Sequence, residues 1–283
     1  MPEAPGPRQV LTPPVSELRP DKDPRPLACV YLVGAGPGDP GLLTVRAAGL
    51  LAQADAVFHD ELVPRAILDQ VRPGAKIIGA GHRAGQTRRP LGDAIAAMAA
   101  RARRGELVIR LKGGDPFLFG RGAEEAQALL AAGVAFEVVP GISSALAAPA
   151  AAGIAVTHRD LASSVTIVTG HERSGGGRVS WERLAGSSDT LVVLMGATRL
   201  TELCREIIAA GRDPITPAAV VMSATCPEQR QVVGTLAALP ALAAEAEIGS
   251  PAVLVVGEVA SLASVLGRGA TLMSLAELEA QAV

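Results

Sequence analysis

Aromatic side chains are scarce in this chain of 283 residues, where Phe, Trp and Tyr together make up 2%. Proteins that bind single-stranded nucleic acids stack the bases on aromatic rings, so this class of partner is disfavoured. The formal net charge of -2 provides no overall attraction for a polyanion either, although it leaves room for a local basic site. We therefore expect no nucleic-acid partner.

Cysteine and long apolar runs are also rare. The three cysteines are widely spaced and form no CxxC pair, which predicts reduced thiols and a cytoplasmic location. The first residues lack the basic and apolar segments of a signal peptide. The longest charge-free stretch, residues 138–157, is interrupted by prolines and glycines, whereas a membrane span needs about 20 predominantly apolar residues. We expect no membrane association.

The chain nevertheless has enough apolar material for a core, since 49% of its residues are hydrophobic and 19% are charged. Residues 1–26 are rich in proline and predict a disordered tail. Beyond them, apolar runs typical of strands alternate with helical segments, a βαβ pattern that predicts an α/β fold with a largely parallel sheet. The turn at residues 140–141 suggests a boundary, so we expect α/β domains over 27–140 and 141–265 and a C-terminal tail over 266–283.

A glycine-rich string, GAGPGDPG at residues 34–41, directly follows the first expected strand. Glycines there let a ligand approach the backbone closely. The fingerprint of a dinucleotide fold needs glycine or alanine five places after Gly34, and that place holds Asp39 between two prolines. An oxidoreductase that binds a dinucleotide is therefore disfavoured, and a rigid turn without a ligand stays open as the alternative.

A second string, RLKGGDPFLFGRGAEE at residues 110–125, lies where a strand ends and a helix begins. Gly113 and Gly114 expose the backbone, Asp115 can accept hydrogen bonds, and Arg121 offers a planar fork for carboxylates. Ligands of open α/β sheets bind at such carboxyl ends of strands. In the alternative interpretation, Asp115 caps the following helix and Arg121 pairs with a neighbouring glutamate on the surface.

A third string covers residues 138–160, where Ser143 and Ser144 follow a tight turn and open a run of small residues. Their hydroxyls and backbone donors would face a cleft, while the alanines leave room for a ligand. Ordinary helix packing through alanine explains the same run. Arg159 is either a substrate clamp or the surface partner of Asp160.

Together with the strings THRD, VTGH and PEQR, these motifs resemble the S-adenosylmethionine-dependent tetrapyrrole methylases, in the branch that methylates uroporphyrinogen III. The resemblance extends from about residue 30 to residue 259. It implies the tetrapyrrole methylase fold of class III methyltransferases, two α/β domains with the active-site cleft between them, and a homodimer. It also implies transfer of two methyl groups from S-adenosylmethionine to C-2 and C-7 of uroporphyrinogen III, giving precorrin-2 through precorrin-1 without a metal.

The resemblance assigns roles to individual residues. Asp60 matches the proton acceptor of the family, although an N-cap role is the alternative, and His82 stands where the family has a lysine proton donor. The substrate-binding residues would be Arg121, Glu124 and Arg159. The two arginines, with Arg83 as a further candidate, would bind the carboxylates of the substrate. The positions that match cofactor contacts, the last by position only because its surroundings depart from the family pattern, are Pro37, Gly113, Gly114, Asp115, Leu118, Ser143, Ser144, Met195 and Ala224.

Two further functions stay open beside a uroporphyrinogen methyltransferase. One is another precorrin methyltransferase of the same family. The other is a tetrapyrrole-binding homologue whose catalysis is weakened by the change from lysine to His82.

Overall fold

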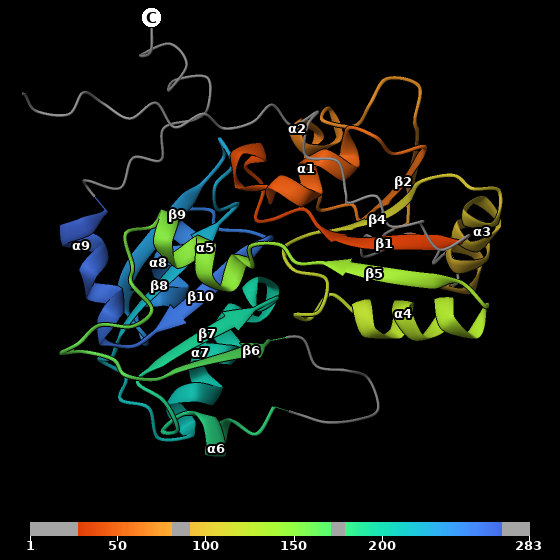
Figure 1. The fold of residues 1–283 in the computed structure, drawn as a ribbon. Coiled ribbons are helices and arrows are strands. Elements are labelled where there is room, and N and C mark those ends of the chain that lie inside the picture. Colours follow the sequence, from red (N-terminus) through yellow and green to blue (C-terminus); the bar gives the residue numbers. More distant parts are fainter. Residues whose placement is uncertain (1–27, 81–90, 171–178, 268–283) are drawn as a thin grey trace, which may run out of the picture.

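The computed structural model describes residues 28–80, 91–170 and 179–267 and consists of two five-stranded sheets that lie side by side (Figure 1). The first part of the chain supplies β1 (Cys29–Gly34), α1 (Val45–Leu51), β2 (Ala56–His59), α2 (Arg65–Leu68), β3 (Lys76–Gly79), α3 (Leu91–Arg103), β4 (Val108–Lys112), α4 (Gly122–Ala131) and β5 (Ala135–Val139). A short 3-10 turn, η2 (Pro40–Leu42), precedes α1.

The first sheet has the strand order β3-β2-β4-β1-β5, and all of its strands are parallel. The parallel sheet predicted from the βαβ pattern is therefore confirmed. Both faces of β1 are covered, since Val30 and Leu32 pack into one hydrophobic cluster and Tyr31 and Val33 into another. This explains why the strand is a continuous apolar run, as is typical of a strand buried on both faces.

The second sheet is mixed. Its order is β6-β7-β10-β8-β9, in which only the pair β6 and β7 is parallel. Its elements are α5 (Ser144–Ala151), β6 (Val165–Thr169), α6 (Trp181–Leu184), β7 (Thr190–Leu194), η3 (Ala197–Arg199), α7 (Leu200–Ala209), β8 (Pro217–Met222), β9 (Arg230–Thr235), α8 (Leu239–Glu245), β10 (Ala252–Val256), η4 (Glu258–Leu262) and α9 (Ala263–Leu266). The predicted α/β fold class is confirmed.

The chain passes from the first sheet to the second between β5 and β6. Ala145, Ala148 and Ala152 of the α5 region pack into the core of the second sheet. The alanines after residue 144 therefore serve close helix packing, which was one of the two interpretations of this string. The domain limits 27–140 and 141–265 stay predictions, and the expected tails lie outside the described residues except for 266 and 267. None of the helices in the described part of the chain is long and apolar enough to cross a membrane.

Three backbone segments cross at the carboxyl ends of β1, β4 and β5. A methyl group at Gly34 would lie 2.5 Å from the Gly141 nitrogen, and one at Gly141 would lie 2.2 Å from the Gly114 carbonyl oxygen. The segments also exchange hydrogen bonds, since the amides of Gly36 and Gly114 each donate to the other's carbonyl group. The crossing therefore needs glycine for its close approach.

We predict that Gly141→Ala destabilises the protein by about 3 kcal/mol, because the added methyl group meets backbone atoms that have no room to move. Gly92→Ala is the matched control, because no atom lies within 4 Å of the added methyl group. Thermal unfolding followed by circular dichroism measures both variants. Equal melting temperatures would show that the crossing tolerates a side chain.

Candidate active site

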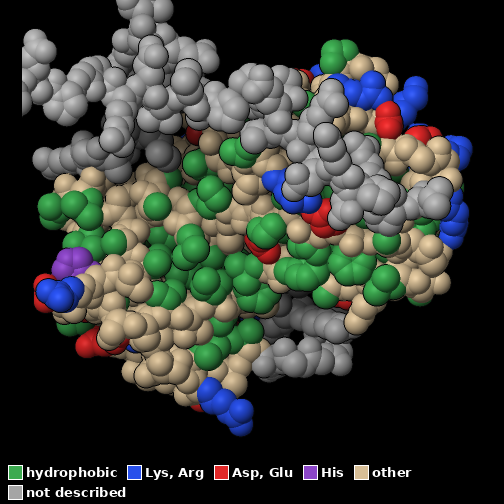
Figure 2. Space-filling model, viewed as in Figure 1, with side chains coloured by type: hydrophobic (Ala, Val, Ile, Leu, Met, Phe, Trp, Pro, Cys, Tyr) green, Lys and Arg blue, Asp and Glu red, His purple; other side chains and the backbone are tan. Residues whose placement is uncertain are grey.

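A cleft of about 1390 Å³ opens where the loops of the first sheet face the second sheet. Both halves of the chain line it, and hydrophobic side chains gather across the middle of the face in Figure 2. The lining includes the loops after β1, β2 and β4, the start of α5, the ends of β7 and β8, and the start of β10. The expected cleft between two α/β halves is present.

The loop after β1 links the two sides of this cleft. The Asp39 amide donates to Thr225 Oγ1 on the opposite side at 3.2 Å, while Asp39 Oδ1 accepts from the Gly41 amide at 2.7 Å. Gln229 fixes the opposite loop, since it accepts from the Thr225 amide and donates to the Ala151 carbonyl group. Pro37 lines the cleft from this loop, which is fixed by the hydrogen bonds of Asp39.

The loop after β4 carries Gly113, Gly114 and Asp115. Asp115 accepts from the Phe117 amide at 2.8 Å and from the Gly141 amide at 3.2 Å. Its carboxylate therefore ties this loop to the turn before α5. It does not cap the following helix, because α4 begins at Gly122 and its N-cap residue is Arg121. A methyl group at Gly113 would meet only Leu62 Cβ, at 4.0 Å, so the backbone of Gly113 is open to a ligand in the cleft.

The start of α5 presents Ser143 and Ser144 to the cleft. Ser143 is the N-cap residue, and its hydroxyl accepts from the Ala145 amide at 3.1 Å. The amides of Leu146 and Ala147 donate to the Ser143 carbonyl group as well, so Ser143 and Ser144 are the residues of this turn that line the cleft.

Strained backbone is concentrated around the cleft. Six non-glycine residues in the described part of the chain have a positive φ, which most side chains avoid. Four of them line the cleft, namely Phe119, Arg121, Met195 and Ser223. Such strain is typical of ligand sites, where the surroundings hold an unfavourable conformation in place.

The floor of the cleft carries four charged side chains in mutual contact. Arg110 on β4 pairs with Asp60, which follows β2, and its Nη2 lies 2.9 Å from Glu125 Oε1 on α4. Lys112 Nζ lies 3.0 Å from Glu125 Oε2 and 3.7 Å from Asp60 Oδ2. Asp60 is therefore part of an ion-pair network and is not the N-cap that the alternative interpretation proposed.

Three residues of this network, Arg110, Lys112 and Glu125, were not predicted as site residues from the sequence. A signal for two of them was present, because residues two apart on a strand point to the same face and Arg110 and Lys112 are charged within a buried strand. Although burial by itself lowers the pKa of Arg110, the charges of Asp60 and Glu125 and their hydrogen bonds raise that pKa overall.

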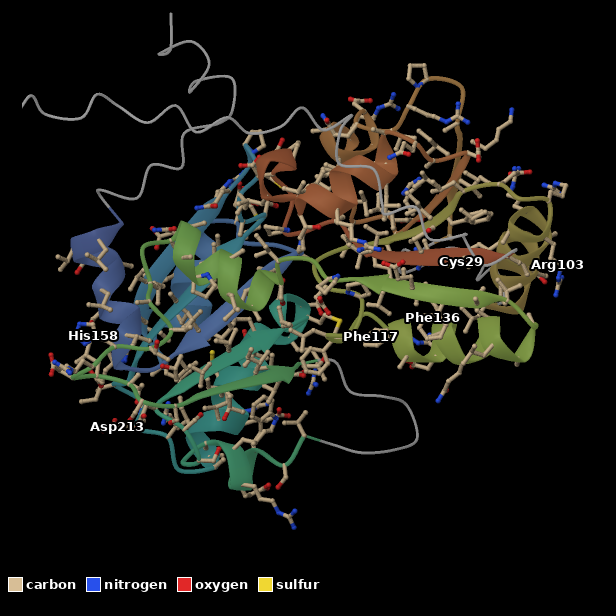
Figure 3. The ribbon with its side chains drawn as sticks, in the orientation of Figure 1. Cys29, Arg103, Phe117, Phe136, His158 and Asp213 are labelled. Carbon is tan, nitrogen blue, oxygen red and sulfur yellow. The ribbon has the colours of Figure 1, made fainter. Side chains whose placement is uncertain are left out.

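The structure brings most of the predicted site residues together, since Asp60, Arg121 and all nine predicted cofactor positions line the cleft. Glu124 is not among the lining residues but lies 3.4 Å from Arg121, and both side chains are more than half exposed. Arg159 is not among the residues that line the cleft. Its neighbour His158 lies at the left edge of the molecule in Figure 3, far from Phe117 in the loop after β4. His82 and Arg83 lie outside the described residues.

Residues 29–240 match the family model described as Tetrapyrrole (Corrin/Porphyrin) Methylases. The chain belongs to the tetrapyrrole methylase family. This confirms the resemblance that the motifs predicted, together with the fold that it implied.

Individual members of the tetrapyrrole methylase family are similar over most of this chain. This chain is 45% identical over 247 residues to an S-adenosyl-L-methionine-dependent uroporphyrinogen III methyltransferase of Methanosarcina barkeri. The match covers 86% of this chain and 96% of that protein. A siroheme synthase of Gluconacetobacter diazotrophicus is 50% identical over 231 residues, which are 81% of this chain and 49% of that protein. The chain thus spans about half the length of the siroheme synthase that it matches.

A solved structure shares the fold. Uroporphyrin-III C-methyl transferase from Thermus thermophilus, complexed with S-adenyl homocysteine, aligns with a TM-score of 0.69 and 40% sequence identity. The alignment covers 81% of this chain and 92% of that chain.

Within the described residues of this chain, no three side chains of His, Cys, Asp or Glu are grouped as a metal site requires.

The thiol of Cys226 also lines the cleft. Burial raises its pKa, and the negative charges of Glu228 and Asp39 raise it further. A thiol with a raised pKa holds less thiolate at neutral pH, and only the thiolate reacts with an alkylating reagent.

We predict that alkylation of Cys226 by iodoacetamide is slow at pH 8 and still accelerates above pH 9, because the thiolate forms only at high pH. Glu228→Gln removes a negative charge and should accelerate the reaction at pH 8, whereas Glu106→Gln, in the loop before β4, should not. Mass spectrometry of the peptide that contains Cys226 gives the rate. A rate that levels off below pH 9 in the parent protein would contradict the raised pKa.

Proposed function

We propose that this chain transfers two methyl groups from S-adenosylmethionine to C-2 and C-7 of uroporphyrinogen III, giving precorrin-2 through precorrin-1. The observation that carries this proposal is a single cleft in which the predicted cofactor positions and Asp60 face the same space. The names of the relatives from Methanosarcina barkeri and Thermus thermophilus support the same reaction.

The cleft has features that fit S-adenosylmethionine. The open backbone of Gly113 admits close contact, and the hydroxyls of Ser143 and Ser144 can donate to a carboxylate such as that of the methionine part. Met195 and Ala224 supply apolar surface on the opposite side for the adenine ring. Leu118, which packs against the core of the second sheet, closes the region between them.

Bound S-adenosylmethionine supplies a methyl group on a positively charged sulfur, which is open to attack by an electron-rich carbon. The chain must align a pyrrole carbon with that methyl group and keep water out, and alignment can account for much of the rate. Each methylation leaves a proton to be removed from the macrocycle. Asp60 is our candidate for the acceptor of that proton, and its exposure supports this role, since it lines the cleft with a side chain that is 27% exposed.

The carboxylates of the substrate call for cations at the cleft. Arg121 lines it with a side chain that is 56% exposed, and its 3.4 Å contact with Glu124 is long enough to give way to a stronger partner. Arg159 and Glu124 stay predictions as substrate contacts, and Arg159 would require a substrate that reaches beyond this cleft. The homodimer, the cytoplasmic location and the lack of nucleic-acid and membrane partners likewise stay predictions.

The direct test of the proposal is incubation of the protein with uroporphyrinogen III and S-adenosylmethionine that carries a labelled methyl group. We expect a product with two labelled methyl groups, identified by mass spectrometry. Transfer to a precorrin offered in a parallel incubation, without transfer to uroporphyrinogen III, would favour another methyltransferase of the family. Binding of both compounds without transfer would favour a homologue with weakened catalysis.

We predict that Gly113→Leu abolishes binding of S-adenosylhomocysteine while the protein stays folded. The added side chain projects into open space in the free protein, so the loss would come from filling the cleft. Calorimetry measures the affinity, and Gly92→Leu on α3 is the control for a leucine that replaces glycine at an exposed site. Unchanged affinity in Gly113→Leu would exclude this part of the cleft as the cofactor site.

We predict that Arg121→Ala raises the KM for uroporphyrinogen III about tenfold and leaves the KM for S-adenosylmethionine nearly unchanged. A charge-assisted hydrogen bond contributes about 1.5–3 kcal/mol, which corresponds to a change of this size. Arg65→Ala, which removes an exposed arginine of α2, controls for the loss of surface charge. Equal substrate KM values in Arg121→Ala and the parent protein would exclude the clamp.

A further inference from the structure

The four charged residues of the cleft floor differ in how they meet the cleft. The side chains of Arg110, Lys112 and Glu125 are 4%, 2% and 6% exposed, whereas that of Asp60 is 27% exposed. Three of the charged groups are thus buried, and the carboxylate of Asp60 is the most accessible of the four from the cleft. Two of the three are cations, and the third is an anion that contacts both of them.

Each oxygen of Asp60 faces a different cation. Oδ1 accepts a hydrogen bond from Arg110 Nη2, and Oδ2 lies 3.7 Å from Lys112 Nζ. The Asp60 amide donates to the Leu111 carbonyl group at 3.0 Å, so its backbone is fixed to β4 as well. The orientation of the Asp60 carboxylate therefore depends on where the two cations are held.

Glu125 holds both cations. Its Oε1 accepts from Arg110 Nε at 3.0 Å, and its Oε2 lies 3.0 Å from Lys112 Nζ. Arg110 also donates to the carbonyl groups of Phe58 and Leu111. Among the described residues, the ammonium group of Lys112 has only the carboxylates of Asp60 and Glu125 as polar partners. Without Glu125 the Lys112 ammonium would turn toward Asp60 and change the position of that carboxylate.

We propose that Glu125 is a positioning residue for Asp60, which acts through Arg110 and Lys112 to hold the proton-accepting carboxylate at one orientation in the cleft. This inference rests on the proposed methyl transfer, because Asp60 matters as a base only in that reaction. Removing the charge of Glu125 leaves two buried cations for one carboxylate, and an uncompensated buried charge forces rearrangement. A small misplacement of a reacting group costs up to about 10²-fold in rate.

The test is a double-mutant cycle in the full chain. Glu125→Gln should lower kcat for methylation of uroporphyrinogen III by about 10- to 100-fold and leave the KM for S-adenosylmethionine unchanged. In an Asp60→Asn background, Glu125→Gln should have little further effect on kcat, because the group that it positions is already lost. Glu106→Gln, which likewise removes a glutamate between two arginines but at the surface, should keep the kcat of the parent.

A role in folding alone would give other results. Full turnover in Glu125→Gln, or the same fold-loss in the parent and Asp60→Asn backgrounds, would overturn the inference. If Glu125→Gln does not fold, the pair Lys112→Met/Glu125→Gln removes one buried charge of each sign and should fold with a reduced kcat; a parental kcat in that variant would overturn the inference. If the parent protein itself transfers no methyl group to uroporphyrinogen III, the proposed function fails, and the inference fails with it.

Discussion

The close crossing of three backbone segments at Gly34, Gly114 and Gly141 is the constraint on which the cleft depends. It brings together the loop after β1, the loop after β4 and the turn before α5. Asp115 strengthens the crossing because its carboxylate accepts a hydrogen bond from the Gly141 amide. Because these segments carry the glycines and serines that face the cleft, the crossing sets the shape of one whole side of the site.

The second constraint is electrostatic. Two basic side chains on the central strand β4 are buried, and burying a charge is costly unless it is paired. Glu125 from α4 and Asp60 from the end of β2 supply the pairing, so the neutralisation of β4 also places a carboxylate at the cleft. Stability of the sheet and the position of the proposed base are thus parts of one arrangement.

Much of this organisation could be predicted from the sequence. The first and fourth strands in the chain, β1 and β4, were visible because their apolar runs lead into glycines, and the family motifs identified the loops that line the cleft. The edge strand β9 was not predicted, because its residues, RQVVGT, alternate poorly and none of them is fully buried. The cleft-floor network was missed for a different reason. Its partners Asp60, Arg110 and Glu125 lie 15 to 65 residues apart in the chain, and they meet only through the pairing of β2 with β4 and the position of α4 beside the sheet.

Arg159 lies apart from the other site residues that the motifs predict. Its string, THRD, matches the family, yet the residue lies away from the cleft that holds the other predicted positions. A motif match identifies a residue type at a place in the chain, whereas its distance from the reacting groups depends on the packing of the whole second half.

The most direct test of the central claim, that one cleft holds the cofactor beside Asp60, is a crystal structure of this chain with S-adenosylhomocysteine. The ligand should contact the backbone of Gly113 and the start of α5, with its sulfur on the side of the cleft that carries Asp60. Binding at any other place, or a sulfur separated from Asp60 by one of the loops, would contradict the account.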